Sequence, residues 1–555
     1  MKNMGAAMKS APQPLLRGLG GEFCAPVVAL WYGACPVSAR LAVRFALLSV
    51  LVFSRLRAAN LASVSLTITE SNRPLPCRIH LVDSTGKSVR ADPLPFWRDH
   101  FVCPGNVTLA LAAGEYRYEV ERGPEYESLR GSFTVADGET KEVKLQLKRI
   151  ADLKREGWWS GELHVHRPPQ DVELLMQAED LHAAPVITWW NNRNLWSTTP
   201  IPAELTRRFD DNRFFNVMGG EDEREGGALL FFHLAKPLDI AGASREFPSP
   251  LKFVEAARKS TESVKSDQPT MGQWIDLEKP FWWDVPIWVA LAKPDSIGLA
   301  NNHMCRSQMY ETEAWGKPRD AQRLPPPRGN GFWTQEIYYR LLNAGVRIPP
   351  SAGSASGVLP NPVGYNRAYV HVDGELTWDK WWAGLRAGRS FVTNGPLLRV
   401  TANGKLPGEV FVMKKGRLRL DLSIKLTSRD KVGEIEIIHN GRVVRTEPIR
   451  TATVMERPEV SKRLTLEVTE PGWFLVRVIA DEPKTFRFAS TAPFYLEVDG
   501  QRRVSRSAAQ LFLDWTRERM QRVRLDDAAQ REEVLRFHRE AERWWMERME
   551  RSNAA

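Results

Sequence analysis

The fold prediction depends on residues 157–192, GWWSGELHVHRPPQDVELLMQAEDLHAAPVITWWNN. We interpret this stretch as a strand ending at His164 and His166, a helix over 172–181, and a second apolar strand over 184–190. Side chains two residues apart in a strand point to the same face, so both imidazoles reach one point. That is a metal-ligand geometry, although alternating histidines also occur as ordinary core or surface residues.

The residues around this pair favour a functional site. Arg167, Pro168 and Pro169 follow at once and lead into the helix, and sites in parallel α/β sheets and barrels collect at such strand ends. Strands and helices then alternate, which implies βα units closing into a barrel-like sheet. Strands are expected at 214–220, 228–234, 272–277, 296–301 and 368–372, and helices at 250–264, 286–292, 334–344 and 378–387.

The flanking segments have a different pattern. Residues 61–153 contain short alternating runs separated by Gly and Asp-Gly, which predict an antiparallel β-sandwich similar to carboxypeptidase-regulatory or prealbumin-like domains. Alternating strands return over 397–500, where Asn440-Gly441 predicts a hairpin. The predicted organisation is a targeting segment (1–60), a sandwich (61–153), a barrel (154–396), an Ig-like sandwich (397–500) and a helical tail (501–555).

Composition restricts the partners that we expect. The chain has 77 basic and 67 acidic residues, and because both signs are interspersed we expect a solvated surface and no nucleic-acid partner. Its five cysteines show no zinc-finger spacing. Cys77 and Cys103 fall in the same predicted sandwich, where they form either a disulfide in an oxidising compartment or two buried free thiols.

The N-terminal segment resembles a processing signal. Arg40 and Arg44 precede an apolar run over 45–53, which has the length of a signal-peptide core and is short for a membrane span. The long stretch before it is explained either by a start downstream of Met1 or by an uncleaved anchor. We therefore expect an exported protein, periplasmic or extracellular, that contacts the membrane only through this segment.

Several motifs carry a family resemblance over residues 157–398. GELHVHRP (161–168), AEDL (178–181), GYNRAYVHV (364–372) and GLRAGRSFVTNGPLL (384–398) resemble the carbaryl-hydrolase-like CehA/McbA metallohydrolases of the polymerase-and-histidinol-phosphatase (PHP) superfamily. The resemblance implies a distorted (β/α)7 barrel whose strand ends hold two or three metal ions for ester hydrolysis.

The resemblance carries over only part of the metal site. His164 and His166 match the family's opening His-x-His, and Glu221 matches its bridging glutamate. Four other ligand positions are replaced by groups that offer no donor atom or carry positive charge. They fall in Thr188-Trp189-Trp190-Asn191, Gly226-Gly227, Lys279-Pro280 and Ser354-Ala355-Ser356-Gly357.

We therefore expect a reduced site of two histidines and one carboxylate that binds one divalent ion, Zn or Mn, or none. A carboxylate such as Glu221 or Glu223 would orient or deprotonate water, and Arg167 or Lys279 would stabilise an oxyanion or a phosphate. Candidate replacement ligands are Asp222, Glu223, Asp180 and His303, whereas His233 is interpreted as a core histidine.

Tryptophan is unusually frequent. The chain has 20, with doublets at 158–159, 189–190, 282–283, 381–382 and 544–545, and core filling is favoured over ligand stacking.

The sequence supports two functional hypotheses. The first is an exported metal-dependent hydrolase of esters or phosphoesters in a small-molecule or glycan substrate. The second is a non-catalytic barrel that binds a glycan or another envelope ligand through a Trp-rich cleft. The oligomeric state is not predicted.

Overall fold

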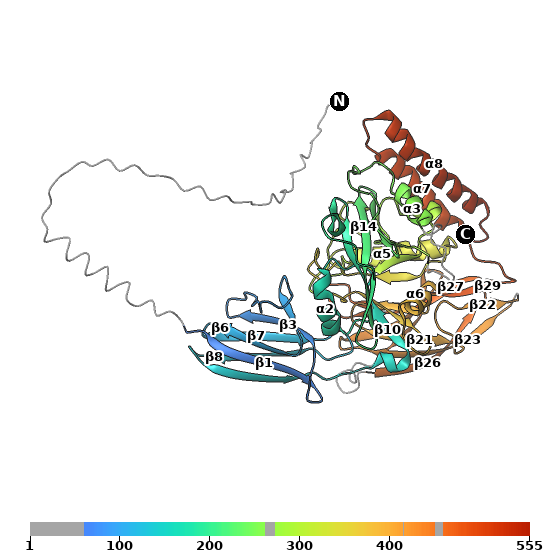
Figure 1. Ribbon diagram of the computed structural model, residues 1–555. Helices are drawn as coiled ribbons and strands as arrows, with labels where there is room; N and C mark the ends of the chain where they lie inside the picture. Colours follow the sequence, from blue (N-terminus) through green and yellow to red (C-terminus); the bar gives the residue numbers. More distant parts are fainter. Residues whose placement is uncertain (1–59, 261–271, 415, 450–458) are drawn as a thin grey trace, which may run out of the picture. The chain divides into compact units, whose positions relative to one another are not determined.

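The computed structural model describes residues 60–260, 272–414, 416–449 and 459–555, and it is a mixed α/β structure rich in strands (Figure 1). Residues Asn60–Ala555 form one compact unit. Within these ranges, no helix is long and apolar enough to cross a membrane. The apolar run at 45–53, and with it the predicted targeting signal, lies outside the described residues.

The first strands form two sheets around a shared hydrophobic cluster, in which Val64 and Leu66 of one sheet meet Ile79 and Val120 of the other. All their pairings are antiparallel except β1–β9, which is parallel. One sheet contains β1 (Ala62–Glu70), β2 (Arg73–Pro74), β6 (Asn106–Leu111) and β9 (Thr140–Gln146). The other contains β3 (Cys77–Asp83), β4 (Phe96–Trp97), β5 (His100–Cys103), β7 (Gly114–Glu121) and β8 (Leu129–Val135).

Cys77 and Cys103 lie directly opposite each other on β3 and β5. Both are buried free thiols whose Sγ atoms are 3.8 Å apart. Of the two sequence-based alternatives, the structure therefore has the thiol form. Cys24 and Cys35 lie outside the described residues.

The central strands follow one another in chain order within a large mixed sheet, as the alternating pattern predicts. Four pairings in this part are parallel, namely β10–β11, β11–β14, β16–β17 and β17–β18. β15 is antiparallel to both β14 and β16, and the short strands β12 (Arg193–Asn194) and β13 (Thr206–Phe209) pair antiparallel with β11 and β14. The strands are β10 (Trp158–Gly161), β11 (Ala183–Trp190), β14 (Arg213–Arg224), β15 (Gly227–Phe232), β16 (Trp274–Leu277), β17 (Ser296–Ala300) and β18 (Pro350–Ala352). The intervening helices are α2 (Val172–Glu179), α3 (Pro250–Lys259), α4 (Val285–Leu291), α5 (Gly329–Asn343) and, after β19 (Arg367–His371), α6 (Trp378–Arg386).

The strand predicted to end at His166 is shorter than expected. β10 ends at Gly161, because the chain there leaves its antiparallel partner β19 and passes between β11 and the residues after β18. Leu163 N donates to Ala352 O at 2.9 Å, and Val165 forms single parallel bridges to Val186 and Ser356. Val165 thus keeps extended geometry between His164 and His166, which is what brings the two imidazoles to one side.

The large sheet continues into the C-terminal strands, which share a hydrophobic cluster with a separate three-stranded sheet. Asn440 and Gly441 have φ of 49° and 82° between β24 and β25, which confirms the predicted hairpin turn. The continuing strands are β20 (Ser390–Thr393), β22 (Val410–Met413), β24 (Val432–His439), β25 (Arg442–Pro448), β27 (Gly472–Ala480), β28 (Phe488–Thr491) and β29 (Phe494–Val498). The separate sheet contains β21 (Leu397–Ala402), β23 (Leu418–Thr427) and β26 (Glu459–Val468).

The predicted helical tail is confirmed as α7 (Arg506–Arg522) and α8 (Ala528–Glu550), which lie side by side and contact α4 (Figure 1). Ser505 and Asp527 cap the two helices through their side-chain oxygens. Buried Arg519 pairs with Asp284 and Glu246, each at 2.6 Å, and the Trp545 indole donates to Pro286 O at 3.0 Å. These contacts bury the apolar stripe of the tail.

The tryptophans mainly fill the core, as expected. Trp189 is stacked on Phe231, and Trp382 lies edge-on to Trp274 and Trp381. In each doublet at least one ring is fully or almost fully buried; the buried members are Trp158, Trp189, Trp282, Trp283, Trp381, Trp382 and Trp545. The doublets therefore supply packing volume more than an open aromatic cleft.

Candidate metal centre

Three of the residues selected from the sequence converge on one point. His164 Nε2 lies 2.9 Å from His166 Nε2, and Glu221 Oε2 lies 3.4 Å from the former and 3.1 Å from the latter. The side chains of His164, His166 and Glu221 are only 4%, 9% and 3% exposed. The centre is therefore enclosed, and His166 is its most accessible edge.

Strand geometry selects which acidic side chains belong to the centre. Glu221, Asp222 and Glu223 are consecutive on β14, so Glu221 and Glu223 share one face while Asp222 takes the other. Asn191 holds this part of β14 in place, since its Oδ1 accepts from Glu223 N and its Nδ2 donates to Glu223 O, both at 2.9 Å. The backbone of Glu223 is therefore fixed at the edge of the centre.

A second carboxylate lies behind His164. Glu278 Oε1 is 3.4 Å from His164 Nδ1, and Glu278 also accepts from the Trp282 indole at 2.8 Å and from the Lys279 ammonium. A proton on Nδ1 directed at Glu278 leaves the Nε2 lone pair facing Glu221, which is the usual arrangement behind a metal-binding histidine. Glu278 thus orients His164 toward the centre.

The electrostatics of the centre depend on these carboxylates. Burial alone would lower the pKa of His164, but Glu221 and Glu278 raise it to about 10. Burial opposes ionisation of Glu221 as well, yet His164 and His166 hold its pKa below the usual range. Burial and the neighbouring Glu221 raise the pKa of Glu223 to about 7. Glu223 is therefore a carboxyl on the ligand face of β14 that changes protonation near neutral pH.

The donor set fits one divalent cation. Two imidazole nitrogens and a carboxylate oxygen are ligands that zinc and manganese accept. Bonds of ~2.0–2.1 Å in a tetrahedral site separate ligand atoms by about 3.3 Å, close to the three distances above. Glu221 Oε2 is buried beside the two imidazoles but has no hydrogen bond of acceptable geometry to either of them, so a cation would complete the bonding of this acceptor.

Other candidates from the sequence lie outside this cluster. Asp222 forms a two-pronged ion pair with Arg224, at 2.7 and 2.8 Å, on the opposite face of β14. Asp180 is enclosed by three arginines at the end of α2. His303 packs between Phe281 and Tyr310, where burial and Lys279 lower its pKa to about 3. None of these side chains is grouped with His164, His166 and Glu221.

Arg167 and Lys279, which were expected to stabilise an oxyanion, also make their contacts with other groups. The Arg167 guanidinium stacks on the Trp97 ring at 5.4 Å and donates to Phe96 O at 3.3 Å, so it ties the loop after His166 to the first strands. Lys279 is buried against Glu278 and lies 4.5 Å from the Trp282 ring centroid. Lys279 adjoins the centre, but its charge is already compensated.

The remaining histidine considered from the sequence, His233, is partly buried and lies edge-on to the core residue Trp382 with ring centroids 4.5 Å apart, so it packs at the edge of the core. At Gly227, an added Cβ would lie 2.3 Å from the Trp282 ring, and at Gly226 it would lie 2.0 Å from the Asp284 carboxylate. These glycines therefore have no space for a side chain that could act as a ligand.

Three buried carboxyl groups near the centre were missed at the level of sequence. Besides Glu278, Glu162 accepts the backbone N–H groups of Ser354 and Gly364, and burial raises its pKa to about 8. Asp276 accepts the hydroxyls of Ser296 and Ser351. Asp276 and Glu278 are two residues apart at a predicted strand end, so the rule that selected His164 and His166 would have indicated them.

A second cluster, in the first two sheets, contains His80, Asp99 and His100. Asp99 Oδ2 lies 3.3 Å from His80 Nδ1, and Asp99 Oδ1 lies 2.9 Å from His100 Nδ1. Each imidazole thus has its own carboxylate oxygen, and the side chain of Asp99 is 56% exposed. Burial lowers the pKa of both histidines and the nearby Arg78 adds to this effect, so the surroundings disfavour added positive charge.

Comparisons with known proteins gave no match that bears on the site. The chain matches none of the protein-family models with which it was compared, and no curated protein matches it.

Asp276 gives the protein a specific pH dependence. Burial raises the pKa of Asp276 to about 7, so between about pH 4 and pH 7 the unfolded chain loses a proton that the folded chain keeps. Stability contributed by this group is complete below pH 4 and is lost as the pH rises to 7. Asp276→Asn keeps an acceptor for both hydroxyls, so we expect it to be more stable than wild type by about 1–3 kcal/mol at pH 8.

Urea unfolding at pH 4.5 and pH 8 measures this difference. The stability gained by Asp276→Asn should grow with pH, whereas the exposed control Asp137→Asn should show no such trend. An equal effect of Asp276→Asn at both pH values would contradict the assignment.

Proposed function

We propose that the chain is an exported, metal-dependent hydrolase of ester or phosphoester bonds in a small-molecule or glycan substrate, with one divalent ion, Zn or Mn, bound by His164, His166 and Glu221. The convergence of these three ligand atoms carries the proposal. Glu278 supports it, because it orients His164 in the manner expected for a ligand.

We further propose that the central strands form a distorted (β/α)7 barrel like that of the carbaryl-hydrolase-like PHP enzymes. The strands β10, β11, β14, β15, β16, β17 and β18 are neighbours in that order. Val165, just beyond β10, bridges Val186 on one side and Ser356, just beyond β18, on the other. These bridges support closure of the strand order into a ring.

The chemistry assigned to the protein groups follows from their positions. A bound divalent ion would supply Lewis-acid activation for hydrolysis. Glu223 lies on the same face of β14 as Glu221, and with a pKa of about 7 it both takes up and gives back a proton near neutral pH. His166 and the half-buried Trp190 ring, whose centroids are 5.0 Å apart, form the edge by which a substrate approaches.

Hydrolysis of p-nitrophenyl acetate and p-nitrophenyl phosphate, with Zn or Mn added, tests the proposal. We expect metal-dependent turnover by the wild type and a loss of about 100-fold or more in Glu221→Gln, because that variant lacks the only anionic ligand. Glu225→Gln is the matched control, since Glu225 lies just after β14 and pairs with Arg245. Turnover equal to buffer with both metals, or unchanged in Glu221→Gln, would reject a hydrolytic function for these substrates.

One observation favours the second function, a non-catalytic barrel that binds a glycan or other envelope ligand. The three ligand side chains are at most 9% exposed, whereas catalytic sites need an open position for water or substrate. In that case the ion would stabilise the fold without turnover. The Trp-rich cleft of this alternative has less support, because most of the doublet rings lie in the core.

A further inference from the structure

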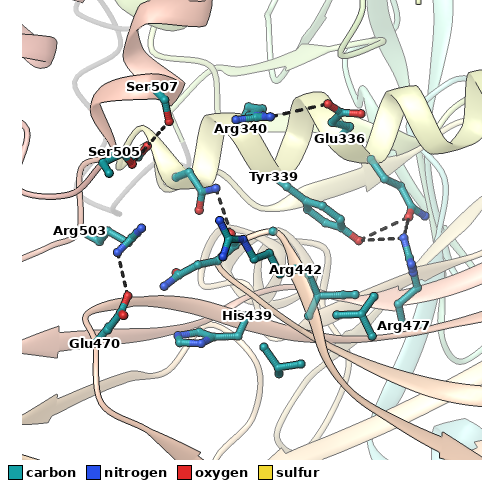
Figure 2. Close-up of a pocket in the computed structure, with 18 of the residues that line it drawn as sticks. Glu336, Tyr339, Arg340, His439, Arg442, Glu470, Arg477, Arg503, Ser505 and Ser507 are labelled. Atoms are coloured by element: carbon teal, nitrogen blue, oxygen red, sulfur yellow. Dashed lines mark hydrogen bonds and ion pairs between the residues drawn. The ribbon is translucent and has the colours of Figure 1, made fainter. Parts of the chain in front are cut away.

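A large polar pocket lies away from the metal centre, between α5, the β24–β25 hairpin and residues 503–507 (Figure 2). Its volume is ≈ 750 Å³, within the range of about 300–1,000 Å³ that small-molecule sites occupy. No residue of the metal centre lines it. The pocket therefore requires an explanation separate from the proposed hydrolysis.

The lining is cationic and incompletely paired. Five arginines and three glutamates line the pocket, an excess of two positive charges. Arg503 pairs with Glu470 at 3.1 Å, and Arg340 lies 3.9 Å from Glu336 (Figure 2). Arg442 is an exposed residue that lines the pocket and has no ion pair among the described residues. An anion is therefore the complementary ligand charge.

Buried polar atoms in the wall lack partners. Gln335 is 1% exposed, and its Oε1 accepts from Arg477 and from the Tyr339 hydroxyl, yet its Nε2 has no hydrogen bond. His439 Nε2 and Arg503 Nε are likewise buried without a partner. Such atoms cost stability unless water or a ligand satisfies them. Three of them around one cavity indicate a ligand with several hydrogen-bonding groups.

The other lining groups restrict the ligand further. Glu336 and Glu467 place carboxylates in the same wall, where they pair with Arg323 at 2.8 Å and with Arg417 at 2.7 Å, and their remaining acceptor capacity suits hydroxyls better than a purely anionic surface. The Tyr339 ring, tilted on Trp473 with ring centroids 5.2 Å apart, adds an aromatic group to the lining. A ligand that carries one anionic group and several hydroxyls satisfies both kinds of wall.

We propose that this pocket binds a small polyhydroxylated anion, either a sugar acid or a sugar phosphate, with its charged group on Arg442. A guanidinium recognises a carboxylate and a phosphate through the same geometry. The choice between a sugar acid and a sugar phosphate is therefore made by experiment. The proposal does not depend on the metal centre or on hydrolysis.

Calorimetric titration of the full chain with glucuronate, glucose 6-phosphate, glucose and inorganic phosphate tests it. We expect saturable binding of one or both sugar anions and at least about tenfold weaker binding of glucose and phosphate, each of which lacks half of the recognised groups. Arg442→Ala should weaken binding by about 10- to 100-fold. Arg442 is exposed and forms no ion pair within the described part of the chain, so this variant should fold normally, which circular dichroism verifies.

The control is Arg419→Ala, an exposed arginine on β23 that does not line the pocket and should leave affinity unchanged. Binding of glucuronate alone assigns the ligand as a sugar acid, and binding of glucose 6-phosphate alone assigns it as a sugar phosphate. No binding of either, equal binding of glucose, or full affinity in folded Arg442→Ala would overturn the proposal.

Discussion

Asp180→Asn is expected to lower the free energy of unfolding by about 3–5 kcal/mol. Asp180 Oδ1 accepts from Arg122 at 3.0 Å and from Arg213 at 2.6 Å, and Oδ2 accepts from Arg149 at 3.3 Å. Although burial acts in the opposite direction, Arg122 and the surrounding cations hold the pKa of Asp180 below its usual range. Asn has the same shape and tolerates the positive φ of 51° at this position, so the variant isolates the loss of charge.

The cost arises mainly from the arginines that remain. The side chain of Arg122 is 7% exposed and has no other ion-pair partner among the described residues, so the substitution leaves a buried charge without compensation. Asp210→Asn is the matched control, because Asp210 pairs with Arg213 at 3.0 Å but is 38% exposed, and we expect a loss below about 1 kcal/mol. Urea unfolding at pH 7 measures both. A loss below about 1 kcal/mol for Asp180→Asn would contradict the claim that Asp180 compensates the buried charge of these arginines.

The same variant separates two roles for Asp180. The sequence makes it a candidate metal ligand, since it lies between the His-x-His strand and the next one. In the structure its partners are Arg122 just after β7, Arg149 after β9, and Arg213 at the start of β14. These contacts span long sequence separations that no local pattern encodes. Asp180→Asn should therefore keep its metal ion while losing stability.

Local patterns were sufficient for most elements of the fold. The apolar run at 184–190 predicted β11, and Asn440-Gly441 predicted the hairpin between β24 and β25. Alternation predicted that His164 and His166 reach one point, and the family resemblance added Glu221; the structure brings the three side chains together. Applied strictly, alternation would have excluded Asp222, whose neighbours on both sides face the centre. The expected strand ended at Gly220, whereas β14 continues to Arg224, so alternation was not applied to residues 221–223.

Tertiary contacts account for what the sequence could not provide. β10 ends early because its neighbour changes from β19 to the residues after β18, which depends on the arrangement of the sheet. Arg167 follows the His-x-His motif directly, yet Trp97 and Phe96 from a distant strand determine where its guanidinium lies. The Trp97 indole also donates to Leu359 O at 2.7 Å, so this hairpin holds two loops near the centre.

His164→Ala/His166→Ala is expected to abolish metal binding. It removes two of three ligands, and a lone Glu221 does not retain a divalent ion at micromolar concentration. The double variant also leaves Glu221 and Glu278 buried without their histidine partners, so its folding must be verified. The second histidine cluster supplies a matched control, because His80→Ala/His100→Ala removes the same number of imidazoles from a site whose pairing needs no ion.

The central claim is that His164, His166 and Glu221 bind one divalent ion. Its most direct test is the metal content of the full chain, loaded with Zn or Mn, desalted and measured by mass spectrometry. The structure predicts about one ion per chain in the wild type and in His80→Ala/His100→Ala, and below about 0.1 in folded His164→Ala/His166→Ala. A wild type without metal, or the same metal content in all three proteins, would contradict the claim.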